Sequence, residues 1–430
     1  IKLARSRQIV ARLESPVFVS VVFAMYKEHT RILTRDAHPD GEDFLRRKLR
    51  QLHWLFDANP ATDFELIAVD DGCPEGSGRL AAEIAAKMND GGPAHCRVLF
   101  LEEAIRAGHA GAAGLTSTDE SQKGGSILYG MAEAAARSHD RQHIVVFTDA
   151  DIATHLGQTG LLIDAIVNDA AAVALGSRRE ANSVVVKQGQ RNDRGKLFIY
   201  LWKRLLPQLG DIIDTQCGFK AFRADLLHKI LPGIEEKHFA FDIELLLRAV
   251  LEKADACRKV AICWIDSEAA STTTNIQPYL PMLKSVARMY RRYLPRDASA
   301  DQFAGLLEQL RESRWQTLLE HIPEEITSRE PASFSDFDAV SAQQLANAAG
   351  MDSFTSIADL MRKAGSPELA IASFQRHYEQ LLAGASGLIA EVEIEPLEGL
   401  PDADELDDDL DTIGNAALAK TVLIKLNGGL

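Results

Sequence analysis

Short apolar segments alternate with amphipathic segments over the first 295 residues of the chain. The apolar segments are rich in β-branched residues, which is typical of buried strands, and they cover residues 17–24, 64–69, 97–101, 143–148 and 171–175. The segments between them repeat apolar residues at helical spacing and cover residues 43–55, 78–88, 126–138 and 159–168. This alternation predicts an α/β fold in which a mainly parallel, Rossmann-like sheet carries helices on both faces.

The pattern changes near Asp297, where helical periodicity continues without strands over residues 299–322 and 341–383. This change indicates an α-helical region after the α/β part. We therefore expect three parts, which cover residues 1–296, 297–390 and 391–430.

Two segments have a composition of their own. Residues 104–125 are rich in Gly, Ala, Ser and Thr, which predicts a mobile loop. The last part begins as an acidic linker and ends in an apolar segment that runs into Asn427-Gly428-Gly429. The chain stops within this pattern and starts at Ile1 rather than Met, so we expect the natural protein to be longer at both ends.

The composition is that of a globular protein, with 46% apolar and 25% charged residues. No stretch approaches the roughly 18 apolar residues of a membrane span, and no secretory apolar region lies near the start. The five cysteines are scattered, which favours reduced thiols in a cytoplasm over disulfides or a zinc site. The net charge of −15 arises mostly from eleven acids in residues 391–411, so the overall balance gives no support for nucleic-acid binding.

Acidic residues follow two of the expected strands directly. Asp149 and Asp151 come after residues 143–148, at the strand end where α/β sheets bind ligands. Carboxylates there suit Mg²⁺ or Mn²⁺ bridged to a phosphate, although two acids can also simply cap a turn. Asp70-Asp71-Gly72 follows residues 64–69 in the same way and can accept from ribose hydroxyls or a pyrimidine N–H, or form an ordinary Asp-Gly turn.

A second pair of motifs lies downstream. The string Asp214-Thr215-Gln216-Cys217-Gly218-Phe219-Lys220 precedes Phe239-Ala240-Phe241-Asp242-Ile243-Glu244-Leu245. Burial of Asp242 among these apolar residues would raise the pKa of its carboxyl and make it a stronger base. The alternative is a helix N-cap, and the two roles are compatible.

Basic residues gather in two places. The first group surrounds the apolar run 197–202 and comprises Lys187, Arg191, Arg194, Lys196, Lys203 and Arg204. The second runs from Lys284 to Arg296 without an acid. Basic amphipathic helices can lie on anionic membranes, and solvated helix faces are the alternative for the second run.

These motifs together resemble a family-2 glycosyltransferase of the GT-A fold over residues 15–295, nearest to the dolichyl-phosphate glucosyltransferase branch. The matching pieces are Val69-Asp70-Asp71-Gly72, Lys123-Gly124-Gly125-Ser126, Thr148-Asp149-Ala150-Asp151, Gly176-Ser177-Arg178, and the two downstream motifs beginning at Asp214 and Phe239. The Asp-Thr-Gln-Cys-Gly-Phe-Lys string is the most specific of them.

The resemblance implies a role for each matched position. Asp70 and Asp71 would bind uridine, Lys123 would lie near the donor, and Asp149 and Asp151 would hold the metal on the diphosphate. Asp242 would be the base. The remaining donor-binding positions would be Tyr26, Glu28, Arg178, Arg191, Arg194 and Gln216, with the three arginines facing phosphates.

The chain departs from the family pattern at a few positions. The segment Ala24-Met25-Tyr26-Lys27-Glu28 lacks the usual Pro and Asn, Cys73 replaces Ser, and Gln122 replaces a Gly before Lys123. These departures concern the nucleotide pocket more than the reaction class.

The C-terminal part resembles the start of UDP-sugar pyrophosphorylases, because Leu400-Pro401-Asp402 precedes the apolar segment 422–430. This resemblance implies a fused donor-making enzyme and favours UDP-glucose as the donor.

We therefore expect metal-dependent inverting transfer of a hexose, most plausibly glucose, from a UDP-hexose to a polyprenyl phosphate. We expect a cytoplasmic protein that contacts the inner face of the membrane peripherally. Three alternatives remain open: transfer to a soluble hydroxyl acceptor, a non-catalytic nucleotide-sugar-binding module that serves a fused pyrophosphorylase, and a nucleotidyltransferase.

Overall fold

The computed structural model describes residues 1–89, 94–137, 139–186, 192–266, 279–329, 331, 340–350, 353–382 and 417. The chain forms two compact units, Ile1–Asp352 and Ser353–Leu430, which are described separately.

The first unit is built on a seven-stranded sheet with the order β3-β2-β1-β4-β7-β5-β8. Only β7 runs antiparallel to its neighbours, so the predicted mainly parallel α/β fold is confirmed. The strands are β1 (Val17–Met25), β2 (Thr62–Asp70), β3 (Cys96–Phe100), β4 (Gln142–Thr148), β5 (Val173–Ser177), β7 (Phe219–Arg223) and β8 (Cys257–Ala261). The short strands β6 (Val184–Val186) and β9 (Cys263–Ile265) form a separate parallel pair.

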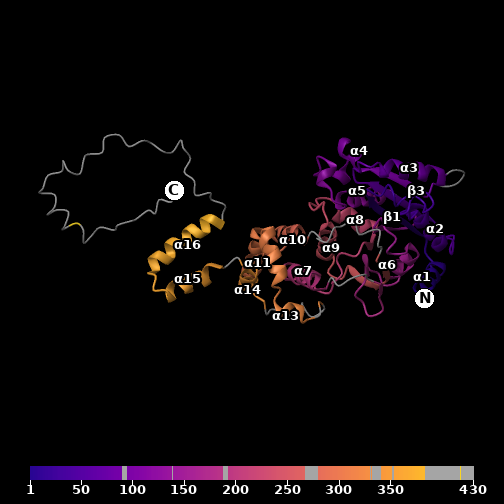
Figure 1. The fold of residues 1–430 in the computed structure, drawn as a ribbon. Coiled ribbons are helices and arrows are strands. Elements are labelled where there is room, and N and C mark those ends of the chain that lie inside the picture. The colour runs from indigo at the N-terminus through magenta and orange to yellow at the C-terminus, as the bar shows by residue number, and fades with distance from the viewer. Residues whose placement is uncertain are drawn as a thin grey trace, which may run out of the picture. The chain divides into compact units, whose positions relative to one another are not determined.

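Helices cover both faces of this sheet (Figure 1). One face is covered by α1 (Lys2–Ala11), α2 (Phe44–Phe56), α3 (Ser77–Met88) and α6 (Thr159–Val167). The other is covered by α4 (Leu101–Arg106), α5 (Gly124–Ala135), α8 (Ala224–Ile230) and α9 (Phe241–Glu252). Helix α5 lies very close to the sheet, since a Cβ on Gly130 would be 2.5 Å from Val22.

The segment expected to be a mobile loop, residues 104–125, contains the end of α4 and the short 3₁₀ helices η1 (Ala110–Ala112) and η2 (Thr118–Glu120). Two further 3₁₀ helices, η3 (Leu156–Gln158) and η4 (Pro207–Leu209), occur in the same unit.

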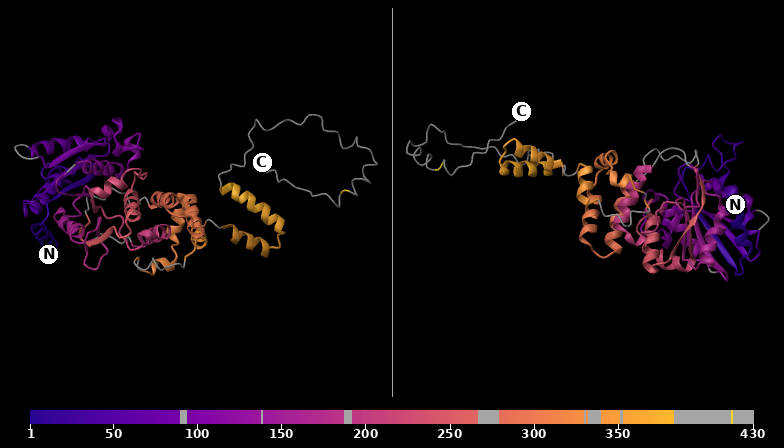
Figure 2. Two further views of the ribbon diagram at one scale, coloured as in Figure 1. Left: turned by 180° about the vertical axis from the view of Figure 1, so that it is seen from behind. Right: turned by 90° about the horizontal axis from the view of Figure 1, so that it is seen from below.

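Helices from beyond the expected boundary at residues 296/297 belong to the first unit. They comprise α11 (Ala298–Gln309), α12 (Glu312–Glu320), α13 (Glu324–Thr327) and α14 (Ala342–Ala348). They gather at one end of the α/β part, in orange in Figure 2, and share a core with α7 (Asn192–Leu205) and with α10 (Tyr279–Tyr293), which lies before the boundary. The unit extends this far because Phe303 and Leu307 of α11 are buried in the same core as the sheet. The periodicity over 299–322 proves to be two helices, α11 and α12.

The second unit contains α15 (Ser353–Lys363) and α16 (Glu368–Leu382), where the rings of Phe354 and Phe374 stack with centroids 6.2 Å apart. The acidic stretch 391–411 and the apolar segment 422–430 lie outside the described residues.

Several side chains of the two basic groups are buried or paired with acids. In α7, Lys196 and Lys203 are buried, and Lys196 Nζ donates to the carbonyl of Thr327 at 2.8 Å, while Lys187 and Arg191 lie outside the described residues. In the second group, Arg291 pairs with Glu308 at 2.7 Å and Arg296 with Asp301 at 3.2 Å. Neighbouring helices cover much of α7, and the membrane contact expected of this helix stays a prediction. None of the helices in the described parts of the chain is both long and apolar enough to span a bilayer.

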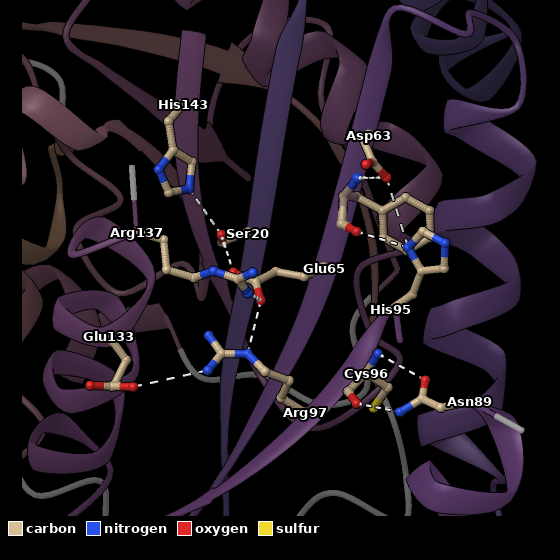
Figure 3. A network of polar contacts seen from close by, with 11 residues as sticks. Ser20, Asp63, Glu65, Asn89, His95, Cys96, Arg97, Glu133, Arg137 and His143 are labelled. Atoms are coloured by element: carbon tan, nitrogen blue, oxygen red, sulfur yellow. Dashed lines mark hydrogen bonds and ion pairs between the residues drawn. The ribbon is translucent and has the colours of Figure 1, made fainter. Parts of the chain in front are cut away.

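A buried polar network crosses the sheet on the face covered by α5 (Figure 3). Ser20 Oγ donates to Glu65 at 2.7 Å and lies 2.9 Å from His143 Nε2. Arg97 and Arg137 both donate to the other Glu65 oxygen, at 2.9 and 2.6 Å. The network satisfies a carboxylate that would otherwise be costly to bury at this position in a strand.

Candidate active site

The strand register brings the sequence motifs to one edge of the sheet. Strands β1, β2 and β4 are parallel, so the residues that follow Met25, Asp70 and Thr148 lie at the same edge. Because β7 is antiparallel to β4, its first residue Phe219 is opposite Thr148. Strand β7 therefore begins beside the end of β4, and Gly218, in the segment before β7, lies against Asp149.

Gly218 marks this meeting point. A Cβ added to Gly218 would lie 2.2 Å from Asp149 Oδ2, which is far closer than any side chain allows. The position therefore needs glycine so that the backbone can approach the Asp149 carboxylate.

Lys123 links two motifs at this edge. It caps α5 with a left-handed φ of 74°, its N–H donates to Asp71 Oδ2 at 2.9 Å, and its ammonium forms an ion pair with Asp149 Oδ1. Burial opposes the charge of Lys123, yet Asp149 holds the pKa of this ammonium above its usual value. Burial likewise would raise the pKa of Asp149, but Lys123 brings it below the ordinary value.

Asp151 lies beside Asp149 in a different electrostatic setting. Its Oδ1 accepts the N–H of Ala153 at 3.1 Å. Burial, and then the charge of Asp149, raise the pKa of the Asp151 carboxyl. A cation bound by both acids would relieve this repulsion.

The donor set fits Mg²⁺ or Mn²⁺. Such ions are often held by one or two carboxylates, while substrate phosphates and water complete the shell. Within the described residues, Asp149 Oδ2 and Asp151 Oδ2 accept no hydrogen bond, so one oxygen of each is available. The part of the chain that the structure describes contains no cluster of three or more His, Cys, Asp or Glu able to hold a metal.

Lys48 holds the turn that carries both acids. Its side chain on α2 is fully buried, and its Nζ donates to the carbonyl oxygens of Asp149 and Asp151 at 2.8 and 2.7 Å. Burial lowers the pKa of Lys48 to about 8, against the opposing charges of the two acids. The two bonds fix the backbone from which the carboxylates project.

Asp70 and Asp71, the expected uridine ligands, are engaged within the protein. Asp70 accepts three backbone N–H groups, from Gly72 and Cys73 at 3.1 Å and from Gly78 at 2.8 Å. Asp71 Oδ1 accepts the hydroxyls of Ser121 and Ser126, both at 2.6 Å. Burial raises the pKa of both carboxyls. Asp70 thus shapes the turn after β2, and Asp71 anchors the loop that carries Lys123.

Tyr26 and Glu28 follow β1 at the same edge. The Tyr26 side chain is 50% exposed, whereas the Glu28 carboxylate pairs with Arg31 at 2.8 Å. Burial raises the pKa of the Glu28 carboxyl, although the charge of Arg31 opposes the rise.

Asp242, the expected base, is buried, and each of its carboxylate oxygens accepts a hydrogen bond. Gln216 Nε2 donates to Oδ1 at 2.6 Å, and Lys220 Nζ donates to Oδ2 at 3.0 Å. Burial raises the pKa of Asp242, although Lys220 and Lys123 oppose the rise. The structure therefore joins the expected Gln216 and Asp242, and it adds Lys220, whose side chain is itself fully buried.

The three arginines expected at phosphates differ in their surroundings. Arg178 forms a two-pronged pair with Asp214, with Nε at 2.9 Å and Nη2 at 2.6 Å from its oxygens. Arg194 is exposed on α7, and Arg191 lies outside the described residues. Asp214 raises the pKa of Arg178 against the effect of burial, so the guanidinium is already paired with a protein carboxylate.

Sequence reasoning missed the roles of Lys48, Lys220 and Asp214. Lys48 did carry a signal, because it falls on the apolar face of α2 between the buried Leu45, Leu49 and Leu52. A lone lysine on an apolar helix face needs a buried acceptor. Lys220 and Asp214 stood in the most specific motif, but spacing alone does not reveal their partners.

Comparisons with known proteins give relatives but no family model that matches. Glycosyltransferase AglD of Haloferax volcanii is 27% identical over 243 residues, which are 56% of this chain and 32% of the relative. The dolichyl-phosphate β-glucosyltransferase of Saccharomyces cerevisiae is 24% identical over 296 residues, which cover 65% of this chain and 76% of the relative. The polyprenol monophosphomannose synthase of Mycolicibacterium smegmatis is 30% identical over 187 residues, with 43% and 61% covered. The chain thus spans about a third to three quarters of the length of these relatives.

Among solved structures, the glucosyl-3-phosphoglycerate synthase of Mycobacterium tuberculosis aligns with a TM-score of 0.43 and 18% identity, over 69% of this chain and 86% of that chain. The same protein is also known in complex with Mn²⁺, UDP-glucose and phosphoglyceric acid, and this structure aligns with a TM-score of 0.43 and 17% identity, over 69% of this chain and 85% of that chain. The sequence relatives are glycosyltransferases, and they confirm the predicted enzyme class.

Proposed function

We propose that this protein is a metal-dependent inverting glycosyltransferase that moves glucose from UDP-glucose to a polyprenyl phosphate. The observation that carries the proposal is the meeting of Lys123, Asp149 and the Gly218 backbone at the carboxyl edge of the sheet. Three motifs far apart in the sequence converge there. The printed names of two relatives, a dolichyl-phosphate β-glucosyltransferase and a polyprenol monophosphomannose synthase, support the acceptor class.

In this proposal, Asp149 and Asp151 hold Mg²⁺ or Mn²⁺ at the donor diphosphate. When bound, such an ion neutralises charge that builds on the leaving diphosphate, a contribution of several kcal/mol. Lys123 lies beside Asp149 and provides a further positive charge for the leaving group. Lys48 keeps the backbone of both acids in place.

The surroundings of Asp242 favour a phosphate acceptor over a hydroxyl acceptor. Gln216 donates to one oxygen of Asp242 and the Lys220 ammonium to the other, so the carboxylate is already paired with a cation of the protein. A hydroxyl nucleophile needs a general base, whereas a phosphomonoester, with a second pKa near ~6, is already anionic at pH 7. A phosphate oxygen of the acceptor then forms a bond to the anomeric carbon from the opposite face. The bond from that carbon to the diphosphate oxygen breaks, and UDP leaves with the electron pair.

The test uses radiolabelled UDP-glucose, Mg²⁺ or Mn²⁺, and either undecaprenyl phosphate in detergent or a mixture of soluble sugars and polyols. We expect label in the organic phase with the lipid phosphate, and loss of this signal by at least 100-fold in Asp149→Asn. Asp169→Asn, at an exposed acid on the surface, is the matched control. GDP-mannose and UDP-galactose in place of UDP-glucose check the sugar and the nucleotide.

Label in a soluble product alone would contradict the lipid acceptor. Tight UDP-glucose binding with no turnover on any acceptor would instead support the non-catalytic nucleotide-sugar-binding module. Transfer that persists after removal of divalent ions by a chelator would contradict the metal dependence.

A further inference from the structure

A cavity of about 370 Å³ is lined by close sequence neighbours of two residues of the candidate active site. Gln122 and Ala240 line it, and these residues stand one position before Lys123 and two positions before Asp242. The opposite wall is α10, which contributes residues from Leu280 to Arg288, a length of about 12 Å along the helix axis. The cavity size is typical of a ligand pocket.

The wall of this cavity, which we call the α10 cavity, is largely apolar on one side. Leu280 and Met282 are each 5% exposed, and Phe239, Ala240 and Pro281 complete the apolar lining. Such a surface gains free energy by covering hydrocarbon and gains nothing from a small polar ligand.

The same cavity carries positive charge one helical turn further along. Lys284 lies four residues after Leu280, on the same face of α10, and its ammonium has no hydrogen bond or ion pair with any residue that the structure describes. Arg288 follows one turn later and contacts Glu236 at 3.4 Å.

The two acids that line the cavity, Glu236 and Glu312, do not pair with Lys284. Glu236 is buried and accepts the N–H of His238 at 3.0 Å in addition to its contact with Arg288. Glu312, which is exposed, accepts from Gln316 at 2.8 Å. Lys284 therefore remains available to an anionic ligand.

We propose that the α10 cavity binds the acceptor as a prenyl phosphate, with its hydrocarbon part against Phe239, Leu280 and Met282 and its phosphate charge offset by Lys284. This inference rests on the proposed function, and it adds the place and the chemistry of the acceptor subsite. A soluble phosphorylated acceptor would share the Lys284 contact but would leave the apolar wall uncovered. The helices beyond the expected domain boundary, through Glu312, would then help to form a substrate site.

Other described cavities fit this role less well. A cavity of about 570 Å³ is lined by Ala110, Leu128 and Leu227, and another of about 370 Å³ by Arg47, Trp54 and His155. Neither touches Gln122 or Ala240, so neither leads to Lys123 and Asp242.

The experiment measures binding of farnesyl phosphate by calorimetry, below its critical micelle concentration and without UDP-glucose. Farnesol and glycerol 3-phosphate separate the contribution of hydrocarbon from that of phosphate. We expect Lys284→Met to weaken farnesyl phosphate binding roughly tenfold and to leave farnesol binding unchanged. Phe239→Ser and Leu280→Asn should weaken both prenyl ligands. Lys259→Met, at an exposed lysine on β8, is the matched control.

Leu280 is buried, so its variant can fail to fold, whereas Phe239 and Lys284 are half-buried and their variants test the cavity independently. Thermal unfolding shows whether each variant is folded. Farnesyl phosphate binding that is absent, or unchanged in all three variants, would overturn the inference. Equal binding of glycerol 3-phosphate and farnesyl phosphate would also overturn it. Because the assay needs no turnover, an inactive protein that still shows the variant pattern would refute the proposed function and keep the subsite.

Discussion

Lys48→Met removes the side chain that joins α2 to the Asp149–Asp151 turn. The Lys48 ammonium is completely buried and makes two short bonds, of 2.8 and 2.7 Å, to carbonyl oxygens. Met keeps most of the aliphatic volume of Lys, so the substitution tests the bonds rather than the packing. We expect both the stability of the protein and its affinity for divalent metal to fall.

The expected loss of stability follows from the two bonds. A hydrogen bond from a charged donor contributes about 1.5–3 kcal/mol, and a carbonyl left unpaired in the interior keeps its desolvation cost. The substitution also removes the cost of burying an ammonium, which offsets part of the loss. We therefore expect a net loss of about 2–4 kcal/mol, which in a unit of this size lowers Tm by roughly 3–5 °C.

The loss of metal affinity has a different origin. Residues that orient metal ligands typically change affinity by roughly 10- to 100-fold when mutated. Lys48 orients the backbone of both expected ligands, so we expect a change in this range for Lys48→Met and a smaller one for Lys48→Gln, which keeps two donors.

The assay titrates Mn²⁺ into the protein with UDP and records the free ion by electron paramagnetic resonance, while calorimetry gives Tm. Lys259→Met provides the control for removing one positive charge at an exposed site. A Lys48→Met protein with lowered Tm but a Mn²⁺ Kd within twofold of the wild type would show that Lys48 is only structural, and the positioning argument would fail.

Three further results are expected. Asp242→Asn should lower kcat with a lipid phosphate less than about tenfold, because an anionic nucleophile needs little base; a loss beyond about 100-fold in the transfer assay would point to base catalysis. Arg178→Lys should lower the free energy of unfolding in urea by about 3–5 kcal/mol. The substitution breaks the two-pronged contact and leaves the Asp214 carboxylate, whose side chain is 5% exposed, poorly paired. A variant as stable as the wild type would contradict this expectation. Burial lowers the pKa of His143 to about 4, so the unfolded chain binds more protons between pH 4 and 6.5, and stability falls as pH falls through this window. Because His143 has partial solvent access, the loss of stability is about 1–2 kcal/mol. The His143→Gln variant should not show this loss. If the urea midpoint shifted equally between pH 7 and pH 5 in the wild type and in this variant, the assignment to His143 would be refuted.

The five strands that the sequence predicts, β1 to β5, are all observed, and their bounds differ from the predicted ones by at most two residues. Each of them contains a run of apolar residues, and four of the five are largely buried. Strand β7 was missed because its sequence, Phe-Lys-Ala-Phe-Arg, places a lysine in the interior. That lysine is acceptable there because Asp242 and the carbonyl of Cys217 accept from it. Only the tertiary structure supplies both partners.

The sequence predicts the position of the site, but it does not predict which charged side chains pair with one another there. Parallel strands place their carboxyl ends together, so acids that follow β2 and β4 had to share an edge. The pairs Lys123–Asp149 and Arg178–Asp214 depend on loops from different parts of the chain. Local patterns contain no record of such contacts, whereas register and antiparallel insertion of β7 determine them.

Charge balance explains why these pairs belong to the site. An edge lined by carboxylates alone would repel a diphosphate, because like charges in a low-dielectric cleft interact strongly. The buried ammonium groups of Lys48 and Lys220 and the half-buried one of Lys123 offset that repulsion, while each keeps a carboxylate or carbonyl in a fixed place. The acids can therefore be close enough to share a cation and still admit an anionic donor. The sequence patterns gave Lys48 and Lys220 no role, and under the proposed function these two lysines, together with Lys123, would let the acidic edge bind a nucleotide sugar.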